Sequence, residues 1–111
     1  MSDYIPEQGD IVMIDFDPAM GREIQKRRPA LVMSKAIMAR HTGLVLVCPI
    51  TSTVRGLELE VAIHGEQITG VALSVQLRAM DYRRRNIAFV EKADAVTVEA
   101  MSELLQDLVK Y

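Results

Sequence analysis

The sequence of 111 residues has few of the residues that build disulfides, metal centres and nucleotide sites. Its single cysteine, Cys48, cannot form an internal disulfide, so we expect a protein of the reducing cytoplasm. Its two histidines, His41 and His64, stand apart from any cluster of Cys, Asp or Glu at ligand spacing. A glycine-rich phosphate-binding loop is also missing. We therefore expect neither a metal nor a cofactor.

Long apolar runs are absent as well. Half of the residues are apolar, yet no uninterrupted stretch approaches the roughly 20 apolar residues of a membrane-spanning helix. Residues 1–6 have neither the basic region nor the apolar core of a secretion signal. The chain is long enough for one hydrophobic core and too short for two. We predict a single soluble domain over residues 1–111, with no membrane partner.

Net charge is small, but the charges are unevenly distributed. A total of −2 argues against a protein that binds nucleic acids over its whole surface. Residues 22–40, however, hold six Lys or Arg against one Glu, a local +5, and residues 78–85 hold four Arg against one Asp, a local +3. From Glu91 onward five acids face two lysines, a local −3. The near-neutral sum hides two basic segments and an acidic C-terminal segment.

Short apolar and alternating runs predict several strands. The buried or half-buried candidates are residues 11–16, 30–33, 44–50, 58–63, 71–78 and 87–90. Within residues 71–78 the alternation places Val75 toward the core. Ser34 and Thr97 are the expected N-caps of a short helix and of an amphipathic C-terminal helix, respectively. The pattern predicts a mainly β fold with a C-terminal helix (α+β), in which a small antiparallel sheet curls into a barrel.

Two polar segments border the core strands. The loop over residues 22–28 gathers four cations and one carboxylate between two apolar runs, and it is either a solvated hairpin tip or a place for an anion. Residues 49–52, Pro-Ile-Thr-Ser, end the central apolar run. A curled sheet could bring the two segments together. Cys48 lies inside an apolar run, which favours a buried, inert thiol over a nucleophile.

With these residues in view, the sequence resembles the MazF/PemK family of toxin ribonucleases. The matching residues run in the family's order along nearly the whole chain: Gly9-Asp10-Ile11, Asp15-Phe16-Asp17-Pro18, Gly21, Glu23, Arg28-Pro29-Ala30-Leu31-Val32, Ser34, Thr42-Gly43-Leu44, Pro49-Ile50-Thr51-Ser52, Gly70-Val71 and Gln76-Leu77-Arg78-Ala79-Met80-Asp81.

The resemblance implies a CcdB/PemK-like fold, an SH3-like barrel that forms a homodimer. It also implies the toxin of a type II toxin–antitoxin system, which cleaves single-stranded RNA and mRNA at short sequences without a metal and so inhibits translation and growth. In that family a ribose 2′-OH attacks its own 3′-phosphate and yields a 2′,3′-cyclic phosphate and a 5′-OH. The implied partner is a cognate antitoxin whose acidic C-terminal segment covers the site.

The resemblance also suggests roles for individual residues. Arg28 takes by position the role of holding the charged phosphate, and Thr51 can donate a hydrogen bond to the same phosphate. Glu23 is a candidate base toward the 2′-OH. The expected RNA-binding residues are Arg22, Lys26, Arg27, Ser52, Gln76, Arg78, Tyr82, Arg83 and Arg85, with Tyr82 offering a stacking face.

A departure from the family pattern keeps other interpretations open. Many relatives carry Asp or Glu just before the glutamine of the late strand, where this chain has Val75. A relative without catalytic activity could act as a protein-binding module, either on its antitoxin or on DNA gyrase, as CcdB toxins do. A purely structural interpretation also exists for each group: Arg28 as a solvated charge, Thr51 as a strand-end hydrogen bond, and Arg83–Arg85 as a solvated turn.

Overall fold

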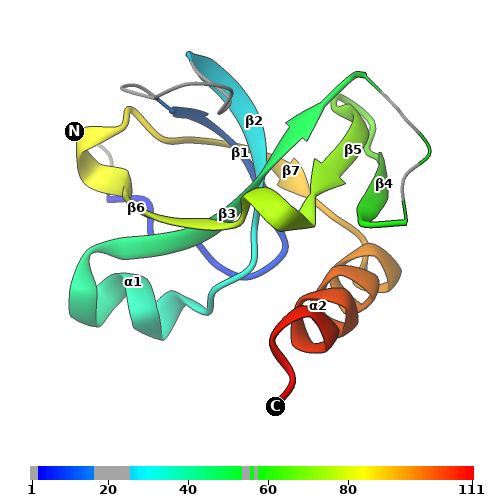
Figure 1. The fold of residues 1–111 in the computed structure, drawn as a ribbon. Helices are drawn as coiled ribbons and strands as arrows, with labels where there is room; N and C mark the ends of the chain where they lie inside the picture. The colour runs from blue at the N-terminus through cyan, green and yellow to red at the C-terminus, as the bar shows by residue number, and fades with distance from the viewer. Residues whose placement is uncertain (1–2, 17–25, 54–55, 57) are drawn as a thin grey trace.

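The computed structural model describes residues 3–16, 26–53, 56 and 58–111 (Figure 1). A curled antiparallel sheet occupies most of the chain, and a helix follows it at the C-terminus, which confirms the predicted fold class. The elements are β1 (Asp10–Asp15), β2 (Arg27–Val32), α1 (Ala36–Thr42), β3 (Leu44–Thr51), β4 (Glu60–His64), β5 (Thr69–Leu73), the 3₁₀ turn η1 (Ser74–Gln76), β6 (Arg78–Asp81), the 3₁₀ turn η2 (Tyr82–Arg84), β7 (Ala88–Lys92) and α2 (Ala95–Val109). No helix in the described part of the chain is long and apolar enough to span a membrane.

Strand β3 is the centre of the sheet. The strand order is β4-β5-β3-β2-β1-β7, and β6 also pairs with β3. Along one side β3 pairs with β2; along the other its residues 44–47 pair with β6 and its last two residues, Ile50 and Thr51, pair with β5. Because two different strands share one side of β3, the sheet divides there and curls instead of remaining flat.

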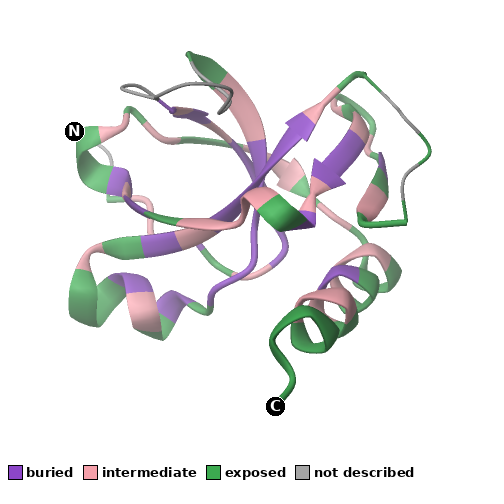
Figure 2. Ribbon diagram, in the orientation of Figure 1, coloured by how far each residue is buried: buried purple, intermediate pink, exposed green. Residues whose placement is uncertain are grey.

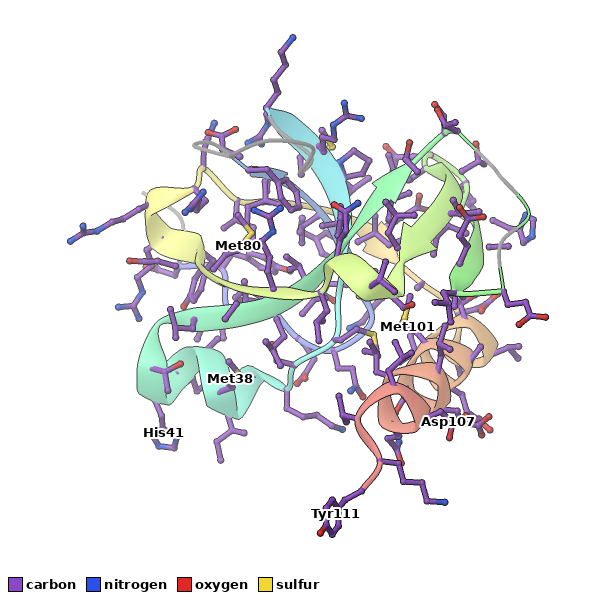
Figure 3. The ribbon with its side chains drawn as sticks, in the orientation of Figure 1. Met38, His41, Met80, Met101, Asp107 and Tyr111 are labelled. Atoms are coloured by element: carbon purple, nitrogen blue, oxygen red, sulfur yellow. The ribbon has the colours of Figure 1, made fainter. Side chains whose placement is uncertain are left out.

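The buried residues form two hydrophobic cores. Figure 2 shows in purple the buried segments of the strands and helices. Alternation sends Val12 and Ile14 of β1 into one core, which Ala39 of α1 helps to fill. Ile11 of the same strand enters the second core together with Met101 of α2. Met101 points from α2 toward the sheet, whereas Tyr111 lies at the far end of the chain (Figure 3). The helix α2 thus closes the second core.

The predicted strand over residues 71–78 is wrong in its middle. The turn η1 interrupts it, so β5 and β6 are separate strands. Ser74 is buried and donates its hydroxyl proton to the carbonyl of Leu59 at 2.6 Å, while Val75 is 63% exposed instead of facing the core. The reason is topological: the chain must move from one end of β3 to the other, and the turn that achieves this breaks the alternation.

The predicted helix caps are also wrong. Ser34 instead accepts a hydrogen bond from the Leu46 N–H at 2.9 Å, and no side chain of the N-cap residue caps α1. The carboxylate of Glu7 accepts from the Ala36 N–H at the start of α1. At α2 the N-cap is Asp94, which accepts from the Thr97 N–H at 2.8 Å. Each first turn is satisfied by a carboxylate outside the position that the sequence pattern suggested.

A buried carboxylate connects the N-terminal segment to β1 and β7. Asp10 is 3% exposed and accepts hydrogen bonds from the Tyr4 hydroxyl and from the Glu7 N–H. The ammonium group of Lys92 lies 2.6 Å from its other oxygen. Burial, followed by the bond to Asp10, raises the pKa of Tyr4 above its ordinary value. Asp10 therefore satisfies three donors in a place that water scarcely reaches.

We expect the substitution Asp10→Ala to lower the free energy of unfolding by about 2–4 kcal/mol, because it removes a buried acceptor that three partly buried donors share. Urea unfolding followed by circular dichroism measures this. Asp107, exposed on α2 (Figure 3), provides the control, and Asp107→Ala should change the free energy by no more than about 0.5 kcal/mol. Equal losses in the two variants would contradict this role of Asp10.

Candidate active site

The base of the β1–β2 hairpin forms one side of the candidate site. In the register of these strands Arg28 lies opposite Ile14, and Arg27 lies opposite Asp15. The Phe16 N–H then donates to the carbonyl of Lys26 at 2.9 Å, and Lys26 adopts a left-handed backbone with φ +68°. The hairpin base fixes the backbone of residues 26–28 beside the end of β1. Arg22 and Glu23 lie outside the described residues.

The strand register brings Arg28 and Thr51 to the same side of the sheet. Strand β2 pairs with β3 as far as Ala30 opposite Pro49, and Arg28 and Thr51 each lie two residues beyond this last pair on their own strands. Side chains two residues apart on a strand share a face, and residues opposite each other on neighbouring strands share it too. Arg28, Ala30, Pro49 and Thr51 therefore belong to one face.

Arg78 joins this face from β6. It lies opposite Val47, which has the same alternation as Pro49 and Thr51. Its guanidinium lies over the ring of the buried Phe16, 5.2 Å from the ring centroid. A cation held over an aromatic ring loses some of its freedom of movement. Arg28, Thr51 and Arg78 thus come from three strands to one face of the sheet.

Strand β5 supports the backbone of Thr51. It pairs with Val71, and a Cβ added to the preceding Gly70 would lie 2.3 Å from the carbonyl oxygen of Thr51. Gly70 also has a backbone φ of +143°, which residues other than glycine rarely adopt. The hydroxyl oxygen of Thr51 accepts from the Thr53 N–H at 3.2 Å, and the exposed Ser52 lies between them. Only a residue without a side chain allows this close approach. This function of Gly70 was not predicted from the sequence, although an isolated glycine in a strand pattern is the usual indication of it.

The two basic segments of the sequence meet at the hairpin base. Arg27 donates to the carbonyl of Asn86 and forms an ion pair with Asp15 at 3.3 Å. The Asp15 N–H donates to the carbonyl of Arg85 at 2.9 Å. The turn η2 and the start of β2, more than fifty residues apart in the sequence, are therefore neighbours in space. Arg83 is exposed nearby.

One expected binding residue is corrected by the structure. Tyr82 is 3% exposed and belongs to the core that contains Val12 and Ile14, so its ring is not a surface for stacking. Its neighbours Arg83 and Arg84 take the solvent positions instead, with Arg83 5.7 Å from the Tyr82 ring centroid. The cause is the turn η2, which directs Tyr82 inward. At Gln76 the side-chain oxygen is buried and has no hydrogen-bond partner among the described residues.

The described residues offer no reactive thiol and no metal-binding group. Cys48 is buried, as the sequence suggested, and burial raises the pKa of its thiol to about 12, so the thiol stays protonated near neutral pH. Within the described residues no three His, Cys, Asp or Glu side chains form a group that could hold a metal ion. The polar face with Arg28, Thr51 and Arg78 is thus the best candidate for an active site.

Comparisons with known proteins agree on the family. A family model described as "PemK-like, MazF-like toxin of type II toxin-antitoxin system" matches residues 7–109. The "Endoribonuclease toxin MazF" of Escherichia coli (strain K12) is 38% identical over 85 residues, 77% of each chain. The "Endoribonuclease toxin ChpB" of the same strain is 40% identical over 105 residues, 88% of this chain and 90% of its own.

Solved structures agree with these sequence relatives. The crystal structure of MazF from Deinococcus radiodurans has a TM-score of 0.92 at 34% identity and covers 98% of this chain and 100% of that chain. A MazE–MazF crystal (Form-II) from the same organism has a TM-score of 0.86 at 35% identity and covers 96% and 97%.

We expect Gly70→Ala to destabilise the protein by about 1–3 kcal/mol and to shift the backbone amide signals of Thr51 and Val71 in NMR spectra. The new methyl group would meet the Thr51 carbonyl, which cannot move without moving the strand end. Gly43, with φ +73° and nothing within 4 Å, provides the control. Gly43→Ala should cost about 1 kcal/mol through backbone strain alone and leave the Thr51 signal in place. A Thr51 signal unchanged by Gly70→Ala would refute the close approach.

Proposed function

The chain belongs to the PemK-like, MazF-like family of type II toxin endoribonucleases, and we propose that it cleaves single-stranded RNA without a metal, at the face that carries Arg28 and Thr51. The observation that best supports this is the strand register, in which both residues share the face of the paired Ala30 and Pro49. Arg78 adds a second cation to that face. These are the groups that a phosphate requires: positive charge and a hydrogen-bond donor.

In the proposed reaction the ribose 2′-oxygen attacks the adjacent phosphorus. A bond forms between phosphorus and the 2′-oxygen, the bond to the 5′-oxygen of the next nucleotide breaks, and the 2′-OH proton leaves to a base. The products are a 2′,3′-cyclic phosphate and a 5′-OH once the leaving oxygen gains a proton. Negative charge that develops on the phosphoryl oxygens is stabilised by the guanidinium of Arg28. Thr51 accepts from Thr53, so its own proton can point to the phosphate.

The proton acceptor is the remaining part of the site. We assign this role to Glu23, which lies outside the described residues but belongs to the chain segment that joins β1 to β2. A carboxylate is a competent base when the 2′-OH is within hydrogen-bond reach. The RNA backbone would follow the cations around the hairpin base, which are Lys26, Arg27, Arg78, Arg83 and Arg85. Arg22, which lies outside the described residues, is assigned the same role. Ser52 and Gln76 add polar contacts.

An antitoxin partner fits the same face. The MazF of Deinococcus radiodurans has been crystallised with MazE. We propose that a cognate antitoxin inhibits this chain through an acidic C-terminal segment that covers the cations of the hairpin base. Opposite charges favour this contact, and the antitoxin would then exclude the RNA from its binding face.

A second copy of the chain is the other proposed partner. A groove of about 590 Å³ lies between η1 and α2. Three apolar side chains at its border are exposed: Val75 by 63%, Leu108 by 44% and Val109 by 82%. A contiguous apolar surface of this kind is costly to leave in water, and pairing with a second copy would bury it. We propose a homodimer that uses this groove.

We expect Arg28→Ala to reduce RNA cleavage by about 10²–10³-fold, because it removes the charge that stabilises the transition state. The assay uses a mixed-sequence RNA in EDTA, maps the cuts and tests for 5′-OH ends. Thr51→Val should also reduce cleavage, with a smaller effect. Arg84, whose side chain is 87% exposed and contacts Asp81, supplies the control, and Arg84→Ala should cleave at the wild-type rate. Cleavage that survives Arg28→Ala would overturn the assignment. A folded wild-type protein that makes no cuts would favour the protein-binding alternative.

We expect the double substitution Val75→Asp with Leu108→Asp to convert a dimer into a monomer, since it introduces charges into the apolar groove. Sedimentation velocity measures the mass. Val96 is 78% exposed on α2 outside the groove, so Val96→Asp should leave the dimer intact. If the double variant sediments as a dimer, this groove is not the interface.

A further inference from the structure

A carboxylate outside the proposed catalytic residues joins the two ends of the sheet. Glu91 lies on β7, and its two oxygens accept three backbone N–H groups, those of Glu66 at 2.9 Å, Gln67 at 3.0 Å and Ile68 at 2.8 Å. These amides belong to the turn between β4 and β5. In the strand order β7 stands at one end and β4-β5 at the other. The side chain of Glu91 therefore bridges the ends of the curled sheet.

The turn is shaped to receive this carboxylate. A Cβ added to Gly65 would lie 2.4 Å from one oxygen of Glu91, so a side chain at this position would push the carboxylate out. The Gly65 N–H donates to the Ile68 carbonyl at 2.9 Å, which closes the turn. Partial burial favours the protonated form of Glu91, but the three amide donors outweigh it and lower the pKa of the carboxyl below its ordinary value. Three converging amides bind the ionised form of the side chain.

This turn leads directly to the strand that supports Thr51. Gly70 follows Ile68 by two residues and lies against the Thr51 carbonyl, and Val71 pairs with Thr51. On the other side, Glu91 is held by β7, which pairs with β1 opposite Ile11. A continuous series of contacts thus runs from the β1–β2 hairpin through Glu91 to the end of β3. The hairpin side and the Thr51 side of the proposed active site are therefore both connected to Glu91.

We propose that Glu91 is a positioning residue for RNA cleavage. Its carboxylate fixes the β4–β5 turn, and through Gly70 it fixes the end of β3 that presents Thr51 to the phosphate. This inference rests on the proposed function of Arg28 and Thr51. The body of the hairpin has separate support, because Ile63 and Ala72 are buried in the core. Loss of Glu91 therefore displaces the strand end without unfolding the domain.

The test compares Glu91→Ala, Glu91→Gln and Glu66→Ala in steady-state cleavage of a short single-stranded RNA. Glu66 is the matched control, because it is an exposed glutamate on the same turn and its loss changes the net charge equally. We expect Glu91→Ala to lower kcat about 10-fold or more, with KM within about twofold, since a small misplacement of a reacting group is costly. Glu91→Gln keeps one acceptor oxygen and should lose less. Glu66→Ala should match the wild type.

Chemical rescue separates positioning from a general loss of structure. Removing the Glu91 side chain leaves three amides that converge on one point, so added acetate should raise the kcat of Glu91→Ala and leave those of the wild type and Glu66→Ala unchanged. In NMR spectra the Thr51 and Gly70 amide signals should shift in Glu91→Ala and return with acetate. A kcat of Glu91→Ala within twofold of the wild type, or a loss with neither rescue nor a Thr51 shift, overturns the proposal.

Arg28→Ala, measured beside these variants, distinguishes the two hypotheses. If Arg28→Ala is inactive and Glu91→Ala is fully active, the site stands and the positioning role is wrong. If Arg28→Ala cleaves like the wild type, the assignment of the site to Arg28 fails, whereas a folded wild-type protein that makes no cuts overturns the proposed function itself. Should Glu91→Ala prove unfolded by circular dichroism, Glu91→Gln decides: a reduced kcat with a shifted Thr51 signal supports the proposal, and a wild-type kcat refutes it.

Discussion

The registers of β2 on β1 and on β3 are the constraint on which the rest of the structure depends. Because side chains alternate, a slip of one residue between β2 and β3 would send Arg28 to the opposite face from Thr51. The slip is prevented by the core, since Ala30 and Val32 must enter one cluster while Leu31 enters the other. Apolar packing on both faces thus determines the geometry of a polar site that lies beyond the packed residues.

Neutral and acidic groups hold the cations of the site in place. Arg27 is held by Asp15 and by the carbonyl of Asn86, and Arg78 lies over the ring of Phe16. Such contacts hold positive groups close together while each group keeps a favourable partner. The arrangement concentrates positive potential at the hairpin base in a protein whose net charge is −2. An anionic polymer would be attracted to that region.

The sequence predicted the parts of the fold that apolar patterns control. Strands β1 and β3 follow their apolar runs to within one residue, whereas β2 begins at Arg27, inside the residues 22–28 that were expected to form a loop. The turns η1 and η2 could not be predicted, because they arise where the chain changes partner along β3 or ends β6. For that reason Val75 was expected inside and Tyr82 outside, and both expectations were wrong. The candidate site was located from the family's matching residues, which follow the same order along this chain. Two of its predicted members, Arg22 and Glu23, lie outside the described residues.

Residues that bind backbone groups are the hardest to recognise in a sequence. Arg28 can be located because an arginine next to a proline belongs to a known pattern, but the three partners of Glu91 are amides, which every residue except proline possesses. The partner of Gly70 is also a backbone group, since the role of Gly70 is to allow the Thr51 carbonyl to approach. A site built from loop and strand ends needs such residues, because packing alone leaves strand ends free to move. The three amides around Glu91 and the carbonyl that approaches Gly70 come together only in the folded chain, and there a structure adds most to what the family resemblance implies.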